Sequence, residues 1–340
     1  MAKTRIAING FGRIGRLFFR RLIEGNDIEV VAINDLGDKD NLIYLLKYDT
    51  VYGRLSKDIK STEKGFSVGG HDVIYLQQKD PALLPWKDLN IDIVVESTGV
   101  FESYEKASVH LKAGAKRVVI TAPAKDADGP IGKTCLLGVN EEDMKTVKIT
   151  SNGSCTTNAA SPVMAILSEN PGIEKAILNT VHAYTATQSI VDGPSHGGDY
   201  RRHRAGAQNM SPSTTGAAIA VARAIPAIVG KFDGIATRVP VVSGSLADIT
   251  FLAKRNTSTE EINKILTEAA KDARWKNILK VTNDQIVSSD IIGEPYGAII
   301  DLSFTKVIDG NLVKVLSWYD NEMGYAATLV GHVLKVAENI

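Results

Sequence analysis

A cysteine in a polar, glycine-containing stretch is the residue best suited to covalent chemistry. Cys155 follows Ser-Asn-Gly-Ser at 151–154 and precedes an apolar run at 159–167 that is typical of a helix, although Pro162 should kink that helix or cost it a hydrogen bond. Near a helix N-terminus, the dipole and free N–H groups favour thiolate over thiol and can hold an oxyanion. Cys155 is therefore a candidate nucleophile, whereas Cys135, beside two leucines, is expected to be an inert buried thiol.

A thiolate nucleophile needs a partner that handles a proton. His182 is the best candidate, because it lies at the end of an apolar strand pattern at 173–183. The other histidines lie among turn or surface-helix residues and are expected to be solvated: His71, His110, His196, His203 and His332. A single histidine at a strand end is more often structural than catalytic, and spacing alone does not establish that His182 meets Cys155.

A glycine-rich turn near the N-terminus is suited to hold a dinucleotide. Gly-Phe-Gly-Arg-Ile-Gly at 10–15 follows an apolar run at 5–9 and opens a helical pattern. In such a turn Gly10 permits the bend, and Gly12 lets the backbone approach a pyrophosphate at the helix N-terminus. Asp35 lies about 20 residues beyond the last glycine, where a carboxylate bonds the ribose hydroxyls of NAD and repels the 2′-phosphate of NADP. The pattern predicts an NAD site; the alternative is a structural glycine turn followed by a solvated aspartate.

Two further features are candidate anion-binding groups. Arg238 lies in an apolar strand pattern at 234–241, where an arginine needs a partner such as a bound phosphate or carboxylate. Ser-Thr-Thr-Gly-Ala-Ala at 213–218 opens another helix, and its hydroxyl and N–H groups suit a second anion. The basic cluster at 201–204 lies in a polar loop at 184–210 and is more simply interpreted as solvated. Two anion seats near a thiol and a dinucleotide suggest a phosphorylated aldehyde and a second phosphate.

The periodicity of apolar residues indicates the elements that must position these groups. In the first half, strand patterns at 5–9, 28–33, 91–95 and 117–120 alternate with helical patterns at 13–24 and 102–112. This alternation argues for a parallel sheet covered on both faces. Ser97 and Thr121 follow two of these strands, at the carboxyl ends where ligands collect. The second half has longer strands with few helices between them, at 173–183, 234–241, 246–253, 298–304 and 312–319.

We therefore predict an α/β chain of two domains, as its 340 residues also favour. Residues 1–154 are expected to form an NAD-binding domain with a Rossmann-type, doubly wound parallel sheet. Residues 155–321 are expected to form an α+β catalytic domain with a mixed, largely antiparallel sheet. The final segment at 322–340, which contains an amphipathic helical pattern, is expected to pack back on the first domain.

The composition excludes several classes of protein. Lys+Arg and Asp+Glu both number 39, so no overall field draws the chain to nucleic acid or to an anionic membrane. Two cysteines are too few for a disulfide framework, and their spacing suits no metal site. The N-terminus does not read as a signal peptide, and no apolar stretch approaches the ~20 residues that span a bilayer. We expect a cytoplasmic protein with no metal and no dedicated nucleic-acid or membrane partner.

Taken together, these motifs closely resemble those of the phosphorylating glyceraldehyde-3-phosphate dehydrogenases, over essentially the whole chain. The matching segments are 8–16, 46–50, 96–101, 154–158, 182–188, 215–218, 237–240 and 318–325. The resemblance implies NAD-dependent oxidation of glyceraldehyde 3-phosphate to 1,3-bisphosphoglycerate with inorganic phosphate, through a hemithioacetal and a thioester on Cys155. It also implies a homotetramer, in which the loop at 184–210 reaches the cofactor of a neighbouring subunit.

The resemblance further implies a role for each matching residue. Cys155 would be the nucleophile and His182 its base. Thr185 and Arg238 are implied to bind the substrate phosphate. The residues implied to bind the attacking phosphate are Ser154, Thr215, Gly216 and Arg201, with Thr156 beside them. The residues implied to bind the cofactor are Gly10, Gly12, Arg13, Ile14, Asp35, Lys79, Ser97, Thr121 and Asn321, the last of which fixes the nicotinamide carboxamide. Lys79 replaces an arginine that is common in the family.

Two alternatives remain. A related enzyme, erythrose-4-phosphate dehydrogenase, hydrolyses its thioester; Thr185 and the Ser-Thr-Thr-Gly seat at 213–216 favour the phosphorylating reaction instead. A non-catalytic binding protein on the same scaffold, for example one that binds RNA, is disfavoured by the complete set of catalytic residues and the zero net charge.

Overall fold

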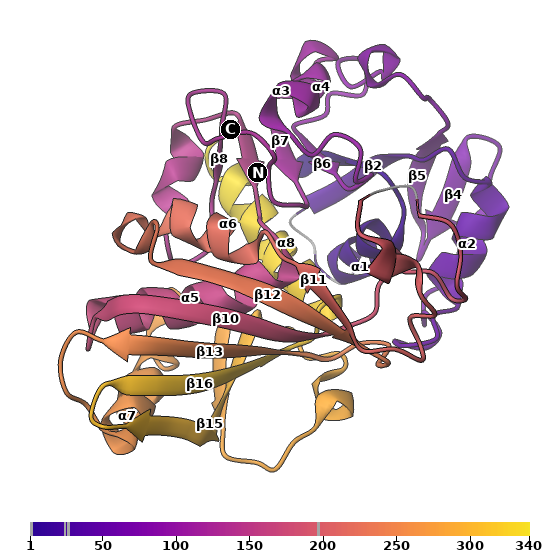
Figure 1. Cartoon of the computed structure of the whole chain (residues 1–340). Coiled ribbons are helices and arrows are strands. Elements are labelled where there is room, and N and C mark those ends of the chain that lie inside the picture. The colour runs from indigo at the N-terminus through magenta and orange to yellow at the C-terminus, as the bar shows by residue number, and fades with distance from the viewer. Residues whose placement is uncertain (1–2, 24, 26–27, 196–197) are drawn as a thin grey trace. The chain divides into compact units, whose positions relative to one another are not determined.

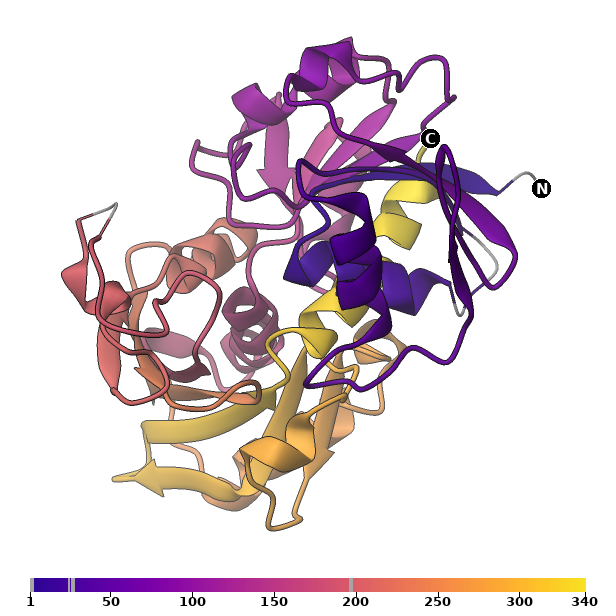
Figure 2. The same ribbon diagram turned by 90° about the vertical axis from the view of Figure 1, so that its right-hand side faces the viewer.

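The computed structural model describes residues 3–23, 25, 28–195 and 198–340 of the chain (Figure 1). His196, expected to be solvated, lies outside the described residues. The chain divides into two compact units, of which the first comprises residues 1–137, 141–153 and 329–340 and the second residues 138–140 and 154–328. The final helix therefore contributes its C-terminal part to the first unit. Figure 2 gives a second view of these elements.

The first unit is built on a sheet in which nine described strands follow the order β3-β4-β5-β2-β1-β6-β7-β9-β8. The strands are β1 (Thr4–Asn9), β2 (Ile28–Asn34), β3 (Ile59–Ser61), β4 (Gly65–Val68), β5 (His71–Leu76), β6 (Ile93–Glu96), β7 (Arg117–Ile120), β8 (Gly132–Thr134) and β9 (Ile149–Ser151). All neighbours pair in parallel except β3 with β4 and β4 with β5. The predicted parallel sheet is confirmed, with an antiparallel extension at one edge.

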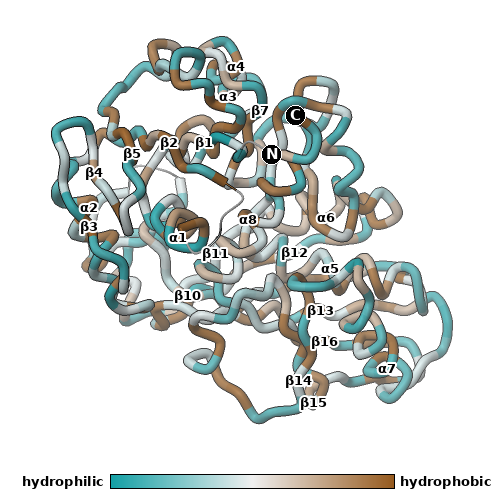
Figure 3. Tube along the Cα trace, turned by 180° about the vertical axis from the view of Figure 1, so that it is seen from behind, coloured by the Kyte–Doolittle hydropathy of each residue, from teal (hydrophilic) through white to brown (hydrophobic). Residues whose placement is uncertain are grey.

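Among the described residues of the first unit, four α-helices connect these strands: α1 (Arg13–Leu22), α2 (Lys39–Lys47), α3 (Tyr104–Ala107) and α4 (Val109–Lys112). Helix α1 buries Leu17, Phe18 and Leu22, and its trace alternates between hydrophobic and hydrophilic in Figure 3, as an amphipathic helix requires. The single helix expected at 102–112 is divided at Ser108. The Ser108 hydroxyl donates to the carbonyl of Glu105, a local bond that competes with a continuous helix.

The segment at 126–134 holds α3 and β8 together. Both carboxylate oxygens of Asp126 accept from the first N–H groups of α3, those of Tyr104 and Glu105. Asp128 accepts from the Tyr104 hydroxyl at 2.7 Å and from the Thr134 N–H at 2.9 Å. A Cβ at Gly132 would lie 2.3 Å from the Tyr104 ring, so the strand passes this ring only as glycine.

The second unit contains a mixed sheet whose seven described strands follow the order β11-β12-β10-β13-β16-β15-β14. Figure 1 shows β12, β10, β13, β16 and β15 side by side in that order. The strands are β10 (Ile173–Ala183), β11 (Ser211–Thr214), β12 (Phe232–Val239), β13 (Ser245–Ala253), β14 (Leu279–Thr282), β15 (Ala298–Ile308) and β16 (Leu312–Tyr319). Pairs β10–β12 and β14–β15 are parallel and the others antiparallel, which confirms the predicted mixed sheet.

The helices α5 (Cys155–Glu169), α6 (Ala217–Ala224) and α7 (Thr259–Ala269) pack on this sheet, and α8 (Met323–Ala337) begins in this unit. Residues 156–167 of α5 are all buried, and the helix continues across Pro162. Along β13, fully buried residues alternate with half-buried ones, because the described helices cover only one face of the sheet.

Candidate active site

Cys155 is the first residue of α5, as the sequence predicts. Ser154 is the N-cap: its Oγ accepts from the Thr157 N–H at 3.1 Å, and the Thr157 hydroxyl accepts from the Ser154 N–H at 3.1 Å. This reciprocal capping box fixes the start of the helix. The preceding residue, Gly153, has φ +62°, a left-handed conformation that glycine adopts without strain. The polar, glycine-containing sequence therefore places Cys155 at the turn into the helix, half-buried.

The structure brings His182 to this cysteine. The Cys155 Sγ lies 3.4 Å from His182 Nε2. His182 is the penultimate residue of β10, and the parallel register places Arg238 of β12 directly beside it. Arg238 Nη1 lies 2.8 Å from His182 Nδ1, and the carbonyl of Ala183 lies 2.6 Å from the same nitrogen. A proton on Nδ1 donates to that carbonyl and leaves Nε2 to accept from the thiol; a proton on Nε2 leaves Nδ1 to accept from Arg238.

Burial favours the neutral form of both members of this pair. Burial, with the charges of Arg238 and Arg202, lowers the pKa of His182 to about 3. Burial also raises the pKa of the Cys155 thiol, against the opposing charge of Arg238 and the hydrogen bond from Thr156. Burial thus outweighs the helix N-terminus, and the thiol form is favoured where the sequence predicted a thiolate. Nucleophilic attack then requires transfer of the thiol proton, for which Nε2 is in place.

Tyr319 is a functional candidate that sequence reasoning missed. Its hydroxyl lies 2.8 Å from the Thr156 hydroxyl and 2.7 Å from that of Thr180, so it ties the residue after Cys155 to the strand that carries His182. Its buried ring packs edge-on against the imidazole, with 5.9 Å between centroids. Tyr319 lies in the segment at 318–325 that resembles the family, but the resemblance implied no role for this tyrosine.

Three of the predicted phosphate-binding residues lie at this pair, and the others make local hydrogen bonds of their own. Arg238 contacts His182 as described, and Ser154 and Thr156 flank Cys155. Thr185 hydrogen-bonds Thr187 through its hydroxyl at 2.9 Å, and the Thr215 hydroxyl accepts from the Ala217 N–H at 3.2 Å beside Gly216, the N-cap of α6.

The two adjacent arginines of the basic cluster differ in environment. Arg201 donates from Nε to Asp199 at 2.8 Å, and its side chain is 60% exposed. Arg202 is half-buried, and its charge acts on both His182 and Arg238. The neighbour of the predicted residue, rather than Arg201 itself, therefore contributes positive potential at the cysteine–histidine pair.

Asn321 is held by a buried serine in the second unit. Ser245 Oγ accepts from the Ala183 N–H at 3.1 Å and lies 2.9 Å from Asn321 Oδ1, to which its hydroxyl donates. The amide oxygen of Asn321 is thereby engaged. One hydroxyl connects the His182 strand to Asn321.

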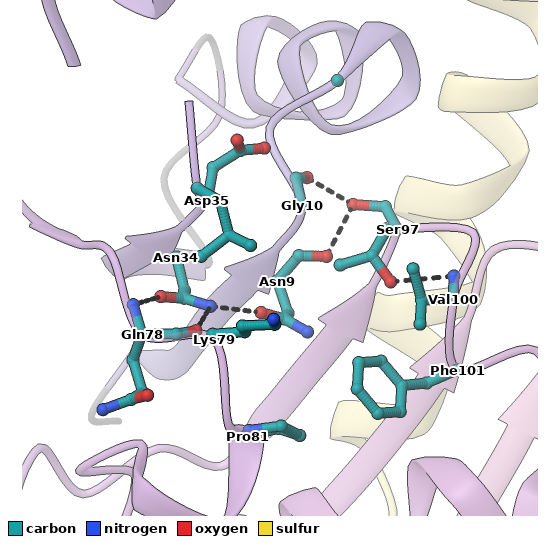
Figure 4. A pocket seen from close by; sticks show the side chains of 13 residues that line it. Asn9, Gly10, Asn34, Asp35, Gln78, Lys79, Pro81, Ser97, Val100 and Phe101 are labelled. Carbon is teal, nitrogen blue, oxygen red and sulfur yellow. Dashed lines mark hydrogen bonds between the residues drawn. The ribbon is translucent and has the colours of Figure 1, made fainter. Parts of the chain in front are cut away.

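The predicted dinucleotide site forms a cavity of about 510 Å³ at the carboxyl ends of β1, β2 and β6 in the first unit (Figure 4). Its lining residues are Asn9, Gly10, Gly12, Asn34, Asp35, Leu36, Gln78, Lys79, Pro81, Ser97, Thr98, Val100 and Phe101. The Asp35 carboxylate accepts from the N–H groups of Phe11 at 2.6 Å and Gly37 at 2.8 Å, and so is fixed at the cavity. Lys79 is exposed on the lining.

The glycine turn meets the steric demands of a dinucleotide. Gly10 has φ +95°, and a Cβ there would lie 2.6 Å from the Thr98 nitrogen; a Cβ at Gly15 would lie 2.2 Å from the Gly10 carbonyl. At Gly12, by contrast, a Cβ would meet no described atom within 4 Å, so the space beside the helix N-terminus is open to a phosphate. The Ser97 hydroxyl donates to the Gly10 carbonyl at 2.6 Å and fixes the turn, as Figure 4 shows. These residues fit the pyrophosphate and ribose of NAD.

Three predicted cofactor residues of the first unit are not among the lining residues of the cavity: Arg13, Ile14 and Thr121. Arg13 forms a bidentate ion pair with Asp49. Although burial acts to raise it, the bonds from Arg13 and from two backbone N–H groups lower the pKa of Asp49. Ile14 follows Arg13 in the first turn of α1, and Thr121 donates to the Glu96 carbonyl at 3.1 Å from the end of β7.

Two histidines expected to be solvated are buried, so that expectation was wrong. His110 is fully buried and lies 2.9 Å from Glu96 and 3.1 Å from the Trp86 indole nitrogen. His332 is fully buried on α8, where burial and the charge of Arg117 lower its pKa to about 3. Cys135 is fully buried, as predicted, and burial raises its pKa to about 12.

Within the described residues, no set of three or more histidine, cysteine or acidic side chains is arranged to hold a metal ion. In the same part of the chain, no helix combines the length and apolar character needed to cross a membrane.

Comparison with known proteins assigns both units to one family. Residues 4–104 match the model of the glyceraldehyde 3-phosphate dehydrogenase NAD binding domain, and residues 154–321 match that of the C-terminal domain. The chain is 48% identical over 339 residues to a glyceraldehyde-3-phosphate dehydrogenase of Streptomyces coelicolor, covering 99% of both chains. It is 47% identical over 331 residues to that of Clostridium pasteurianum, covering 96% of both. The chain belongs to the glyceraldehyde-3-phosphate dehydrogenase family and binds NAD.

Proposed function

We propose that the chain oxidises glyceraldehyde 3-phosphate to 1,3-bisphosphoglycerate, with NAD as the oxidant and inorganic phosphate as the acyl acceptor. This is the reaction of the phosphorylating members of its family. The observation that carries the proposal is the 3.4 Å separation of Cys155 Sγ from His182 Nε2 at the N-terminus of α5. Family relatives of this similarity are named glyceraldehyde-3-phosphate dehydrogenase, so the erythrose 4-phosphate and non-catalytic alternatives are not favoured.

Cys155 and His182 carry the covalent and proton steps. Sγ attacks the aldehyde carbon, while Nε2 takes the thiol proton and returns it to the new oxygen, which gives a hemithioacetal. When hydride leaves the hemithioacetal carbon, Nε2 takes the hydroxyl proton and a thioester remains on Sγ. Phosphate oxygen then attacks the thioester carbonyl and the cysteine leaves as a thiolate, to which Nε2 returns its proton. The N–H groups at the start of α5 are suited to hold the oxyanions of both attacks.

The predicted cofactor residues are assigned to parts of NAD. Gly10 and Gly12 would leave room for the pyrophosphate. Asp35 would bind the adenosine ribose, and Lys79 would lie at the adenine side of the cavity. Arg13, Ile14, Ser97 and Thr121 complete the set, and Asn321 would donate to the nicotinamide carboxamide. The chemistry that NAD supplies when bound is acceptance of the hydride.

Two sets of residues would bind the phosphate groups. Thr185 and Arg238 are proposed for the substrate phosphate. Ser154, Thr215, Gly216 and Arg201 are proposed for the attacking phosphate, with Thr156 beside them. We add Arg202 to this set, because its charge already acts on His182 and Arg238. When a phosphate binds Arg238, we expect the bond from Arg238 to His182 Nδ1 to be lost, which favours the tautomer with Nε2 free.

We further propose that the chain acts as a homotetramer in the cytoplasm, a reducing compartment that preserves the Cys155 thiol. The uncovered face of the second sheet supports an assembly, since it exposes large apolar side chains: Ile177 at 60%, Ile235 at 51%, Phe304 at 54% and Ile308 at 62%. The loop at 184–210 likewise exposes Ile190, Val191, Tyr200 and Met210. A second copy of the chain would remove both apolar surfaces from water.

The experiment that tests the reaction follows NAD reduction at 340 nm with glyceraldehyde 3-phosphate, with and without inorganic phosphate. Rapid reduction that depends on phosphate is expected. Turnover that is indifferent to phosphate would contradict the phosphorylating step and its proposed residues. A preference for erythrose 4-phosphate in the same assay would replace the substrate.

A further inference from the structure

Three neighbouring strands of the first unit end in polar side chains that bond one another beneath the cavity. Asn9, Asn34 and Glu96 are the last residues of β1, β2 and β6, and the parallel register places Asn9 opposite both others. Asn34 Nδ2 donates to Asn9 Oδ1 at 2.8 Å, and Asn9 Nδ2 donates to Glu96 Oε2 at 2.6 Å. All three are at least 95% buried, so these bonds are shielded from water.

Glu96 is the common acceptor of this network. Besides Asn9, it accepts from the Thr98 N–H at 2.8 Å and from the Thr98 hydroxyl. The Trp86 indole N–H donates to His110 Nδ1 at 3.1 Å, so the imidazole proton lies on Nε2 and is donated to Glu96 Oε2 at 2.9 Å. Every chain of hydrogen bonds therefore donates toward this one carboxylate.

The groups that Glu96 holds belong to opposite walls of the dinucleotide cavity. On one wall, Asn34 is bonded twice to the backbone of Gln78, through Oδ1 at 2.8 Å and Nδ2 at 3.0 Å. On the other, the Thr98 hydroxyl accepts from the Val100 N–H at 3.1 Å. Figure 4 shows Asn34 bonded to both Gln78 and Asn9, with Val100 across the cavity. His110 also packs edge-on against Phe101, another lining residue.

We propose that Glu96 is a positioning residue for NAD: its carboxylate ties the two walls of the cavity at the spacing that the adenosine half of the cofactor needs. It is not itself among the lining residues, so it acts through Asn9 and Thr98. The inference rests on the proposed function, which places the adenosine of NAD in this cavity. Pre-formed walls favour binding because less ordering remains to be done when the ligand arrives.

The variant Glu96→Gln tests this requirement without a change of shape. If the amide NH₂ takes the place of Oε2, it faces the N–H groups of Asn9 and His110. If it takes the place of Oε1, it faces the Thr98 N–H. Either orientation sets donor against donor in a buried site, so one wall must move away.

Calorimetric titration of the variant with NAD, and with ADP-ribose as a probe that lacks nicotinamide, measures the effect. We expect Kd for both to rise about tenfold, or ~1.4 kcal/mol. KM for NAD should rise similarly, while kcat at saturating NAD stays near that of wild type. Thr150→Val is the matched control: it removes a buried 2.7 Å bond to His332 outside the cavity and should lower Tm without changing either Kd.

Two results overturn the inference. One is a Glu96→Gln protein that binds ADP-ribose within twofold of wild type; the other is an equal loss of affinity in Thr150→Val. Wild-type protein that binds neither ligand would instead refute the proposed NAD site, and the inference with it. If Glu96→Gln does not fold, Thr98→Val serves as the second variant, because Thr98 is exposed and the change removes only its hydroxyl. This variant should bind NAD and ADP-ribose more weakly, and Thr98→Ser, which keeps the hydroxyl, should restore binding.

Discussion

At the scale of single residues, the cysteine–histidine pair is arranged for proton transfer during the reaction rather than as a thiolate–imidazolium ion pair. Burial lowers the pKa of His182 to about 3 and raises that of Cys155, so both groups are neutral before substrate arrives. A neutral imidazole 3.4 Å from a thiol can act as a general base, because it accepts the thiol proton when the sulfur attacks. The loss of this base should therefore affect chemistry far more than binding.

Replacement of His182 by Asn is expected to slow hydride transfer by about 10²–10⁴-fold, the usual contribution of a positioned base. NAD affinity should stay nearly unchanged, because the cavity in the first unit is intact. Single-turnover absorbance and calorimetry measure the two quantities. His71→Asn, at an exposed position on β5, is the control and should match wild type. An unchanged single-turnover rate in His182→Asn would remove this residue from the mechanism.

At the scale of elements, the sequence predicted the features that depend on neighbouring residues. The glycine turn, the strands predicted at 5–9 and 28–33, and the start of α5 follow from residue types within a few positions. The burial of His110 and His332 did not follow, because their partners Glu96 and Thr150 lie 14 and 182 residues away in the chain. Helical periodicity shows which face is apolar, but not which polar residue meets a buried partner.

The buried histidine of α8 makes the first unit sensitive to acid. Its Nδ1–H donates to Asn152 at 3.2 Å and its Nε2 accepts from Thr150. The pKa of His332 is about 3 in the folded chain and 6.5 ordinarily, so below pH 6.5 the unfolded chain binds a proton that the folded chain does not. Stability from this group is complete above pH 6.5 and is lost as the pH falls toward 3, at about 1.4 kcal/mol per pH unit.

Urea unfolding between pH 7.5 and 5 measures this loss. In His332→Gln, the dependence of unfolding free energy on pH should fall by about one proton relative to wild type. His71→Gln, which replaces an exposed histidine, should retain the wild-type slope. Equal slopes in all three proteins would show that His332 is protonated in the folded state.

At the scale of the whole molecule, the uncovered face of the second sheet is the feature that an isolated chain does not explain. Light scattering should find four chains per particle. Ile177→Asp places a charge on this face, at a side chain that is 60% exposed, and should yield smaller particles. Leu83→Asp, at a 68% exposed side chain of the first unit, is the control. A wild-type monomer would refute the proposed tetramer.

The complete burial of Cys135 allows folded and unfolded chains to be told apart by the number of thiols that react. Of the two cysteines in the chain, only the half-buried one can meet a reagent while the fold is intact. An alkylating agent should therefore modify one thiol per native chain and two per denatured chain, counted by intact mass. In a sample alkylated without denaturant, folded chains therefore carry one adduct and unfolded chains carry two. The share of singly modified chains in the intact-mass spectrum gives the fraction of folded protein in a preparation, with no substrate added.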